Sequence, residues 1–583
     1  MKRLSALCQL SGALALFVAA LTCLLQPINA AAATVAQETD LRDDRYVDAN
    51  VIAHLKLGTT VDIVKSEAGW VCITFAHKTG WVRANMLSGS GATAAGAATV
   101  EGGRSASGNI VATSSIRSMP RTTRHALIIG VGSYADAALT PLSGVQYDIA
   151  SARSMAVAMS IPEHNMHVLR DQDASKDGIA RAISALNEQV RAGDRVFVYF
   201  SGYGTQVPEQ VGTAGASTSN CADAFVASDS RAVSSTELAA WLSPIMDKAD
   251  KLMFFYDAGM SAAQVPTGSK SKFLASMAGA CAQTDKTVGS DFFAHALQQG
   301  ALAQNLVQIA AARHEEMVPD DEKNGGITTQ AWRDCMAGDA RDLDHSGAIS
   351  MDEIAVCTQQ KLQAWQHPGT LLQHVVVSGN QALIPGWFKG AAVAAPSLAA
   401  AGSAGKALDD ILWQRDARHQ VSVRLDSALL NIDKDALHFS VNSSHAGYLY
   451  IILLGSDGQS FYMLFPNDVD QNNAIKAGQT VFLPRQSWTV TAQGPAGIDK
   501  MLVVVTDAPR AFASVGSARS GPFLTALTDS EGRANLQWLL GTAMYQASAL
   551  CAHDGKTDAV VQAALSQCSD AFGATLVEIV EQK

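Results

Sequence analysis

The feature that most constrains the fold is a series of short apolar segments between residues 124 and 386. They lie at 126–131, 166–169, 196–200, 252–256, 306–310 and 374–377, separated by helix-like or polar stretches. In one such stretch Ser175 is a candidate N-cap, and Ile179, Ile183, Leu186 and Val190 share one helical face. Apolar strands that alternate with helices form a mostly parallel sheet covered on both faces. We therefore predict an α/β domain at 124–386 with a six-stranded, mostly parallel sheet flanked by helices.

Two of these strands end in loops that contain glycine. The strand at 196–200 runs into Ser201-Gly202-Tyr203-Gly204, and the strand at 252–256 runs into Asp257-Ala258-Gly259. These loops resemble the two catalytic loops of the caspase and metacaspase cysteine peptidases, in a degenerate bacterial form. That family carries Ser-Gly-His-Gly in the first loop and Asp-x-Cys-His-Ser-Gly in the second. The resemblance implies a caspase-like fold with its site beyond the carboxyl ends of the strands, where parallel sheets bind ligands.

The residues that would perform peptidase chemistry are absent from both loops. Tyr203 stands where the family has its histidine base, and Gly259 stands where it has its cysteine nucleophile. Tyrosine titrates near pH ~10 and is a poor general base at neutral pH, and glycine has no side chain to attack a carbonyl. We therefore expect no intact catalytic site. Ser261 and Cys221 remain as candidates for a displaced nucleophile.

Several acidic residues are candidates for holding a basic substrate side chain, as acidic residues do in metacaspases. Asp257 matches the family's aspartate just before the nucleophile. Asp148, near the start of a predicted helix, also matches an aspartate of the family, and no role is assigned to it. Asp223 and Asp229 lie in a stretch that resembles the acid-rich segment after the first catalytic loop, where some metacaspases bind calcium. The alternative for Asp223 and Asp229 is a pair of solvated loop acids.

The stretch at 342–353 fits a twelve-residue EF-hand calcium loop. Calcium takes oxygen ligands from positions 1, 3, 5, 7, 9 and 12 of such a loop, and a glycine at position 6 makes the sharp turn. Gly347 takes the turn, and the ligand positions carry Asp342, Asp344, Ser346, Ala348 (through its carbonyl), Ser350 (directly or through water) and Glu353. Ser346 replaces the usual Asp or Asn, which should weaken binding. We expect bound Ca²⁺; the alternative is an acidic surface loop without metal.

The amino terminus has the pattern of a secretion signal, with Lys2 and Arg3, an apolar run at 10–25 and small residues at 30–33. The run is shorter than the ~20 residues that a membrane-spanning helix needs. We predict a signal peptide at 1–30, no stable span in the mature chain and a periplasmic or secreted location, with an uncleaved anchor as the alternative. The chain has 54 acidic and 43 basic residues, a formal charge of −11, which argues against a nucleic-acid partner.

The stretches that flank the α/β domain have different patterns. Residues 41–89 alternate short apolar runs with turns and resemble the bacterial SH3 module, a small all-β barrel that often holds exported proteins on the cell wall. Residues 90–122 and 391–405 are rich in small residues and are typical of linkers. Residues 410–583 have a β-rich pattern with a partly helical tail from about 535. They resemble an uncharacterised domain that is often fused behind bacterial caspase-like domains.

Export also permits disulfides. The plausible pairs are Cys335 with Cys357 and Cys551 with Cys568, and Cys72 is a candidate for a buried thiol. Spacing alone does not determine the connectivity.

The patterns favour an exported, catalytically degenerate caspase-like protein. It would bind a peptide or protein partner in a calcium-linked way at the cell envelope, with the cell wall as a further binding partner through the SH3-like module. One alternative is an active cysteine endopeptidase that cleaves after basic residues with a displaced nucleophile. Another is a purely structural envelope protein.

Overall fold

The structure is a computed structural model of the whole chain. It describes residues 32–35, 39–42, 51–67, 70–83, 87–88, 121–210, 219–260, 270–275, 281, 292–365, 373–386, 400–510, 516, 518–541 and 569–583. These residues belong to two compact units, 1–95 and 96–583. The predicted signal peptide and nearly all of the predicted linker at 90–122 lie outside the described residues. No helix in the described part of the chain is long and apolar enough to cross a membrane.

The first unit is an antiparallel sheet with strand order β3-β2-β6-β5-β4-β1-β7. Its strands are β1 (Ala32–Val35), β2 (Thr39–Arg42), β3 (Val51–Leu55), β4 (Thr60–Glu67), β5 (Trp70–Phe75), β6 (Lys78–Arg83) and β7 (Leu87–Ser88). Val35, Leu41, Val71, Ile73 and Val82 are buried in its core. The unit therefore begins earlier than the predicted residue 41, because β1 pairs with both β4 and β7. Its likeness to a bacterial SH3 module stays a prediction.

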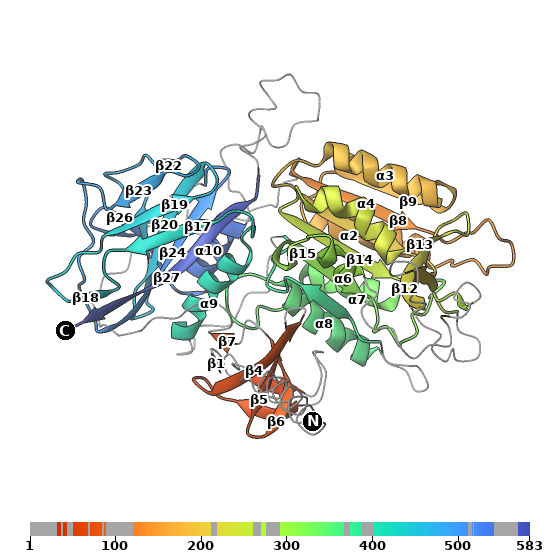
Figure 1. Cartoon of the computed structure of the whole chain (residues 1–583), viewed down its shortest axis with the longest axis horizontal. Coiled ribbons are helices and arrows are strands. Elements are labelled where there is room, and N and C mark those ends of the chain that lie inside the picture. Colours follow the sequence, from red (N-terminus) through yellow and green to blue (C-terminus); the bar gives the residue numbers. More distant parts are fainter. Residues whose placement is uncertain are drawn as a thin grey trace, which may run out of the picture. The chain divides into compact units, whose positions relative to one another are not determined.

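The second unit begins with the predicted α/β domain (Figure 1). Its main sheet has the order β16-β15-β14-β10-β8-β9, and only β16 runs antiparallel to its neighbour. The strands are β8 (Arg124–Gly130), β9 (Met166–Arg170), β10 (Arg195–Ser201), β14 (Lys251–Asp257), β15 (Leu306–Ala310) and β16 (Val376–Gly379). The predicted six-stranded, mostly parallel sheet is confirmed. A smaller antiparallel sheet, which the sequence reading treated as loop, contains β11 (Gly204–Gln210), β12 (Ser219–Val226) and β13 (Ala232–Ser234).

Helices cover both faces of the main sheet because alternate side chains of each strand point to opposite faces. Phe197, Tyr199 and Phe255 share a core with Trp332 of α7, and on the opposite face Phe254 contacts Phe292 of α6. The helices are α2 (Val145–Ala158), α3 (Lys176–Gln189), α4 (Ser235–Met246), α6 (Phe292–Gln298), α7 (Ile327–Asp334) and α8 (Met351–Ala364). The predicted N-cap of α3 is confirmed, since Ser175 Oγ accepts a hydrogen bond from Gly178 N at 3.1 Å.

The C-terminal domain is a large sheet between a pair of helices and a smaller sheet. Within β20, Tyr450 and Ile452 pack on the helices, whereas Leu449 and Ile451 pack toward the smaller sheet. The helices are α9 (Ala400–Trp413) and α10 (Ser530–Gly541). The small sheet contains β17 (Val421–Leu425), β19 (Phe439–Ser443) and β23 (Thr480–Leu483). The large sheet contains β18 (Leu429–Asn431), β27 (Phe572–Gln582), β24 (Gly497–Thr506), β20 (Gly447–Leu454), β21 (Ser460–Phe465), β26 (Phe523–Leu527) and β25 (Ala518–Ser520), and β22 (Ala474–Ile475) pairs with β20.

One boundary prediction is wrong in this region. The predicted linker at 391–405 overlaps α9, because Ala404 and the residues that follow it bury an apolar face against the large sheet. The predicted partly helical tail begins within α10 and ends in β27, which pairs with β24 along its whole length. Residues 542–568, which include the predicted pair Cys551 and Cys568, lie outside the described residues.

Buried polar contacts join the α/β domain to the C-terminal domain. Arg124 Nε donates to Asp570 Oδ2 at 2.9 Å, and Asn305 Nδ2 donates to Asp416 Oδ1 at 2.7 Å. Arg418 donates to the carbonyl of Ala249 at 2.6 Å. These contacts connect β8 and the turn before β15 with the segments that precede β27 and follow α9.

Candidate functional site

The two glycine loops lie side by side at the carboxyl ends of β10 and β14. The strands pair in parallel register, with Ser201 opposite Asp257 and also opposite Gly130 of β8. Gly202 N contacts Asp257 O at 3.4 Å across the loops. The positions that the sequence singled out are therefore neighbours, at the sheet edge where parallel sheets place their sites.

The Tyr203 side chain makes a hydrogen bond and a ring contact within the same domain. Its hydroxyl donates to the carbonyl of Thr140 at 3.0 Å, and its ring lies 5.1 Å from that of Tyr134. Burial raises the pKa of Tyr203 above its usual value. A phenol with a raised pKa and an engaged hydroxyl is a poor proton acceptor at neutral pH.

A short segment of the same chain, 270–275, lies against both loops. Gly204 N donates to Lys272 O at 2.8 Å, and Gly259 N donates to the same oxygen at 3.1 Å. Leu274 N donates a hydrogen bond to Gly204 O at 2.8 Å. One carbonyl thus accepts two backbone N–H groups, which is how peptidases hold the oxygen of the bond that they cleave.

The Lys272 side chain is fully buried among acidic groups. Its Nζ donates to Asp148 Oδ2 at 2.7 Å, to Asp257 Oδ1 at 2.9 Å and to Ser201 Oγ at 3.1 Å. The two carboxylates hold the pKa of Lys272 well above its usual value despite the opposing effect of burial. The pKa of Asp257 is raised mainly by burial, with Lys272 opposing this effect and Asp148 adding to it. The predicted basic-side-chain site at Asp257 is therefore filled by a lysine of the same chain.

A side chain at position 259 would face the carbonyl of Lys272. A Cβ atom added to Gly259 would lie 3.4 Å from the carbonyl carbon of Lys272, 3.3 Å from Phe273 N and 3.0 Å from Phe273 Cβ. The Lys272–Phe273 peptide bond therefore sits where a scissile bond would sit if position 259 carried a side chain. Gly259 itself has no side chain that could attack this carbonyl.

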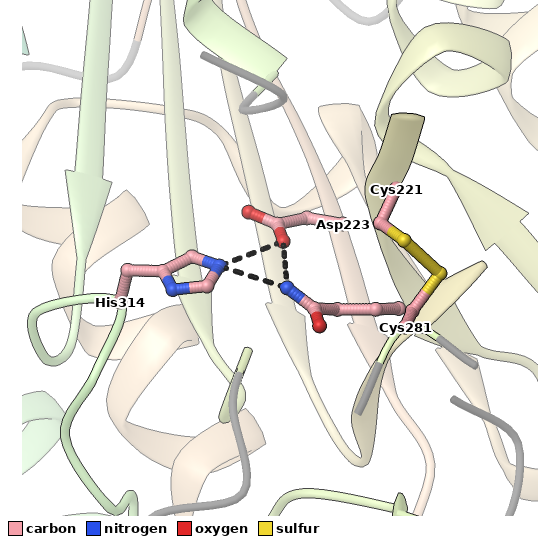
Figure 2. Close-up of a disulfide and its surroundings, with 5 residues drawn as sticks. Cys221, Asp223, Cys281 and His314 are labelled. Atoms are coloured by element: carbon pink, nitrogen blue, oxygen red, sulfur yellow. Dashed lines mark hydrogen bonds and ion pairs between the residues drawn. A yellow bond between two sulfur atoms is a disulfide. The ribbon is translucent and has the colours of Figure 1, made fainter. Parts of the chain in front are cut away.

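Asp223 and Asp229 have other partners. Asp223 Oδ1 lies 3.0 Å from His314 Nε2 and 3.5 Å from Gln206 Nε2, close to the disulfide shown in Figure 2. Asp229 pairs with Arg231 at 2.7 Å, a contact that helps to lower the pKa of Asp229. The structure does not bring either carboxylate to Lys272, so the three predicted substrate-binding acids do not form one pocket.

The cysteines bear on the alternative of a displaced nucleophile. Cys221 forms a disulfide with Cys281, a pairing that the sequence reading missed, and its sulfur is therefore not a thiolate. The predicted pair of Cys335 and Cys357 is confirmed. Cys72 is a buried thiol, as predicted. Ser261 lies outside the described residues.

The loop at 342–353 brings its acidic residues together. Carboxylate oxygens of Asp342, Asp344 and Glu353 all lie within 4.8 Å of one another. Burial and the neighbouring carboxylates raise the pKa of Asp342 to about 6 and that of Glu353 to about 8. Gly347 has a φ of +97°, the left-handed conformation that the turn at position 6 requires. The repulsion that raises these pKa values is what a bound cation would relieve.

The other predicted ligands have different surroundings: Ala348 and Ser346 lie in the loop, whereas Ser350 lies at the start of α8. Ala348 is buried in the loop, as its predicted carbonyl role requires. Ser350 caps α8, since its Oγ accepts a hydrogen bond from Glu353 N at 3.3 Å and donates to Glu353 Oε2 at 3.0 Å. Ser346 is fully buried in the loop. The donor set of hard oxygens fits Ca²⁺.

Comparison with known families agrees with the geometry of the α/β domain. Residues 123–378 match the family described as the caspase domain. We call this region the caspase-like domain after the family model that it matches. Residues 431–509 match a family described as a domain of unknown function, DUF4384. A comparison with curated proteins found no match.

Two solved structures are similar to part of this chain. A Geobacter sulfurreducens protein, solved in a structural genomics programme, has 16% sequence identity and a TM-score of 0.32, covering 44% of this chain and 93% of its own. Caspase-1 from Spodoptera frugiperda has 11% identity and a TM-score of 0.31, covering 46% of this chain and 93% of its own.

Sequence reasoning missed Lys272. Lys270 and Lys272 alternate with serine in a short polar run after the second loop, a weak signal that many exposed loops share. Asp148 was found through the resemblance, and its carboxylate does converge with that of Asp257 on one ammonium group.

Proposed function

We propose that this protein is an exported, catalytically degenerate caspase-like protein that recognises a basic residue and its carbonyl without cutting the chain. The observation that carries the proposal is the set of hydrogen bonds that hold Lys272. Its carbonyl accepts the N–H groups of both loops, and its ammonium lies between Asp148 and Asp257. The caspase-like domain suggests a peptidase-related ancestry. This geometry supports a site that still binds a basic residue but does not catalyse peptide cleavage.

The absence of chemistry follows from two positions. A cysteine peptidase needs a thiolate and an imidazole in contact, and removing one member of such a unit costs about as much as removing all of it. Tyr203 and Gly259 supply neither group. The disulfide at Cys221 argues against that residue as a displaced nucleophile.

The partner would be a peptide or protein segment with Lys or Arg. Such a segment competes with 270–275 for the same two N–H groups and the same two carboxylates, because only a cation compensates those buried charges. Calcium at 342–353 would stabilise the domain in which this exchange occurs. The amino-terminal pattern and the SH3-like module support a role at the cell envelope, in the periplasm or outside the cell.

The test is a binding measurement with a blocked, fluorescein-labelled peptide that copies residues 269–274. We expect Lys272→Ala to bind this peptide at least tenfold more tightly than the wild type, because the variant leaves Asp148 and Asp257 free to bind the lysine of the peptide. Lys270→Ala is the matched control, since Lys270 lies on the same segment but pairs with Glu322 at its surface. A peptide with norleucine in place of the second lysine should not bind, and mass spectrometry should find every peptide intact.

A purely structural role is the second candidate, and the complete burial of Lys272 favours it, because an integral segment is hard to displace. If neither the wild type nor Lys272→Ala binds the basic peptide, the recognition proposal is wrong and this candidate stands. Removing Lys272 leaves two buried carboxylates without their partner, which should lower the free energy of unfolding by about 3–5 kcal/mol. Binding is therefore measured at a temperature where circular dichroism shows the variant folded. Hydrolysis of the peptide by the wild type would instead support an active peptidase.

A further inference from the structure

Three basic residues begin three neighbouring strands of the main sheet. Arg124 of β8, Arg195 of β10 and Lys251 of β14 lie in register across the parallel strands. Residues in register on neighbouring parallel strands point to the same face, and such strands are roughly 4.8 Å apart. All three side chains are buried. Three buried cations therefore stand in a row, at the opposite end of the sheet from the glycine loops.

Two carboxylates contact this row, and each is shared by two cations. Asp250 lies 2.9 Å from Arg195 Nε and 2.5 Å from Lys251 Nζ. Asp570 lies 2.9 Å from Arg124 Nε, and a second arginine, from the segment before β8, also reaches it. Like charges opposite each other on neighbouring strands repel, and a buried charge without a full counter-charge is costly. The contacts therefore leave an excess of positive charge at this end of the sheet.

Other charged groups nearby do not remove this excess. Arg510 of the C-terminal domain is a further buried cation, and its Nη2 donates to the carbonyl of Asp570 at 3.2 Å. Asp194, a further buried carboxyl at this edge, contacts His125 at 2.9 Å. Burial lowers the pKa of Arg124 to about 10, Asp570 opposes this effect, and the neighbouring charge of Arg195 adds to it.

A small cavity lies beside two of the cations in the row. It is lined by Arg124, Arg195 and apolar residues that include Met159, Phe197 and Met253. Its volume of about 10 Å³ is room for one water molecule or one ion of similar size. Arg124 Nη2 and both Nη atoms of Arg195 are buried and have no hydrogen-bond partner among the described residues. Buried polar groups almost always have a partner, so these donors indicate a ligand.

The chemistry of the cavity favours an anion over water. The three unpartnered atoms are all donors on charged groups, and the nearby carbonyl of Met159 already accepts from Arg124 Nη1 at 2.6 Å. A buried water molecule needs acceptors for its own hydrogens, whereas an anion needs donors alone and also balances the positive charge. The space is too small for a polyatomic anion such as sulfate or phosphate. A halide fits both the size and the charge.

We propose that the protein binds one chloride ion between the guanidinium groups of Arg124 and Arg195, at the amino-terminal ends of the central strands. This site is separate from the glycine loops and from the acidic loop at 342–353, and it does not depend on the proposed function. Arg124 also holds Asp570, which lies just before β27. The ion therefore stabilises the contact between the caspase-like domain and the C-terminal domain.

The test is thermal unfolding of the full-length protein in sodium gluconate, with chloride added at constant ionic strength. We expect the melting temperature to rise with chloride and then level off, by about 2 °C or more, because an ion that binds only the folded state stabilises it. Sulfate should leave the midpoint of the chloride titration unchanged, since it is too large to enter the cavity. A melting temperature that does not respond to chloride would overturn the proposal.

Arg195→Lys removes donors from the cavity and keeps the positive charge. The lysine can still pair with Asp250, but the two Nη atoms are lost. We expect the midpoint of the chloride titration to rise by about tenfold or more. Arg181→Lys, the same change at an exposed position of α3, is the matched control and should respond to chloride as the wild type does. If Arg195→Lys also keeps the wild-type midpoint, the chloride site lies elsewhere and the inference is wrong.

A second measurement uses the wild type alone. Bromide has the same charge as chloride and a similar size, and anomalous X-ray diffraction identifies it directly. In crystals grown with sodium bromide, we expect an anomalous peak in contact with the Nη atoms of Arg124 and Arg195. Density without an anomalous signal at this position would show that the cavity holds water, and the chloride site would be excluded.

Discussion

Lys272, Gly259 and Tyr203 lie together at the two glycine loops of the caspase-like domain. Lys272 supplies a carbonyl that is held by two backbone N–H groups and an ammonium that is held by two carboxylates. In the proposed function, Gly259 and Tyr203 supply neither a nucleophile nor a base. The recognition elements and the reactive elements of a peptidase would then be separable residue by residue, because a backbone N–H donor survives every substitution except proline, whereas a reactive side chain does not.

Restoring the reactive side chains should restore cleavage within the chain. In the double variant Tyr203→His with Gly259→Cys, we expect a cut between Lys272 and Phe273, since a side chain at 259 begins 3.4 Å from the Lys272 carbonyl carbon. The thiolate attacks that carbon, the imidazole protonates the departing Phe273 amine, and water hydrolyses the thioester. Phe273 must move by a few tenths of an ångström to admit the new Cβ.

The disulfide makes this cut easy to recognise. Cys221 and Cys281 lie on opposite sides of the bond, so the two fragments should remain together on a non-reducing gel and separate on a reducing gel. The same variant with Lys272→Ala added is the control and should stay whole. A double variant that remains intact over days, with and without calcium, would contradict the assignment of Lys272–Phe273 to the scissile position.

At the scale of elements, the sequence of each strand explains why the main sheet was predicted and the small sheet was not. The main sheet was recognisable because its central strands β8, β10, β14 and β15 are buried along their whole length and therefore largely apolar. The small sheet of β11, β12 and β13 was missed because its strands carry Pro208, Glu209 and Asp223 among their residues and lack a clear alternation. The acidic loop at 342–353 was recognisable because its carboxylates are close together along the chain.

One strand pair of the C-terminal domain should make stability depend on pH. Asp499 of β24 is buried beside Glu581 of β27, and burial together with that neighbouring carboxyl raises the pKa of Asp499 to about 7. The folded state therefore keeps a proton that the unfolded state loses above its ordinary carboxyl pKa. The free energy of unfolding should fall as pH rises from about 4 through 7, by up to ~3 kcal/mol.

Urea denaturation at pH 5 and pH 8 measures this effect. Asp499→Asn should flatten the decrease, because the amide does not titrate. Asp426→Asn, a change at an exposed carboxyl, should leave the decrease as it is in the wild type. An unchanged pH dependence in Asp499→Asn would show that the proton is not shared between these two strands.

At the scale of the whole molecule, buried charges tie the caspase-like domain to the C-terminal domain. Arg124 of β8 contacts Asp570 just before β27, and burial lowers the pKa of Arg124 to about 10 while Asp570 opposes that effect. Arg121 also lies 3.4 Å from Asp570. Contacts of this kind join residues that are hundreds of positions apart, so no local pattern announces them.

Removing the acidic partner should weaken the whole unit. Asp570→Ala leaves Arg124 buried without its counter-charge, and we expect a loss of about 3–5 kcal/mol in the free energy of unfolding, measured by guanidinium denaturation. Glu163→Ala removes a partner of Arg153 from an exposed pair and should cost less than ~1 kcal/mol. Equal costs for the two variants would mean that the contact between the domains is not a stabilising one.

The sequence by itself determined the parallel sheet, the two glycine loops with Tyr203 and Gly259, and the acidic spacing at 342–353. Each of these is a local pattern, in which neighbouring residues either bury apolar faces or carry polar atoms at fixed spacing. Only the tertiary structure decided what lies against the glycine loops and what lies against the acidic loop. Lys272 reaches Asp148 and Asp257 through space, and Gly347 meets the backbone of Arg533 and Ala534 in the same way. The choice of a partner for a buried charge depends on which distant segments the packed fold brings within a few ångström, and spacing along the chain does not encode that.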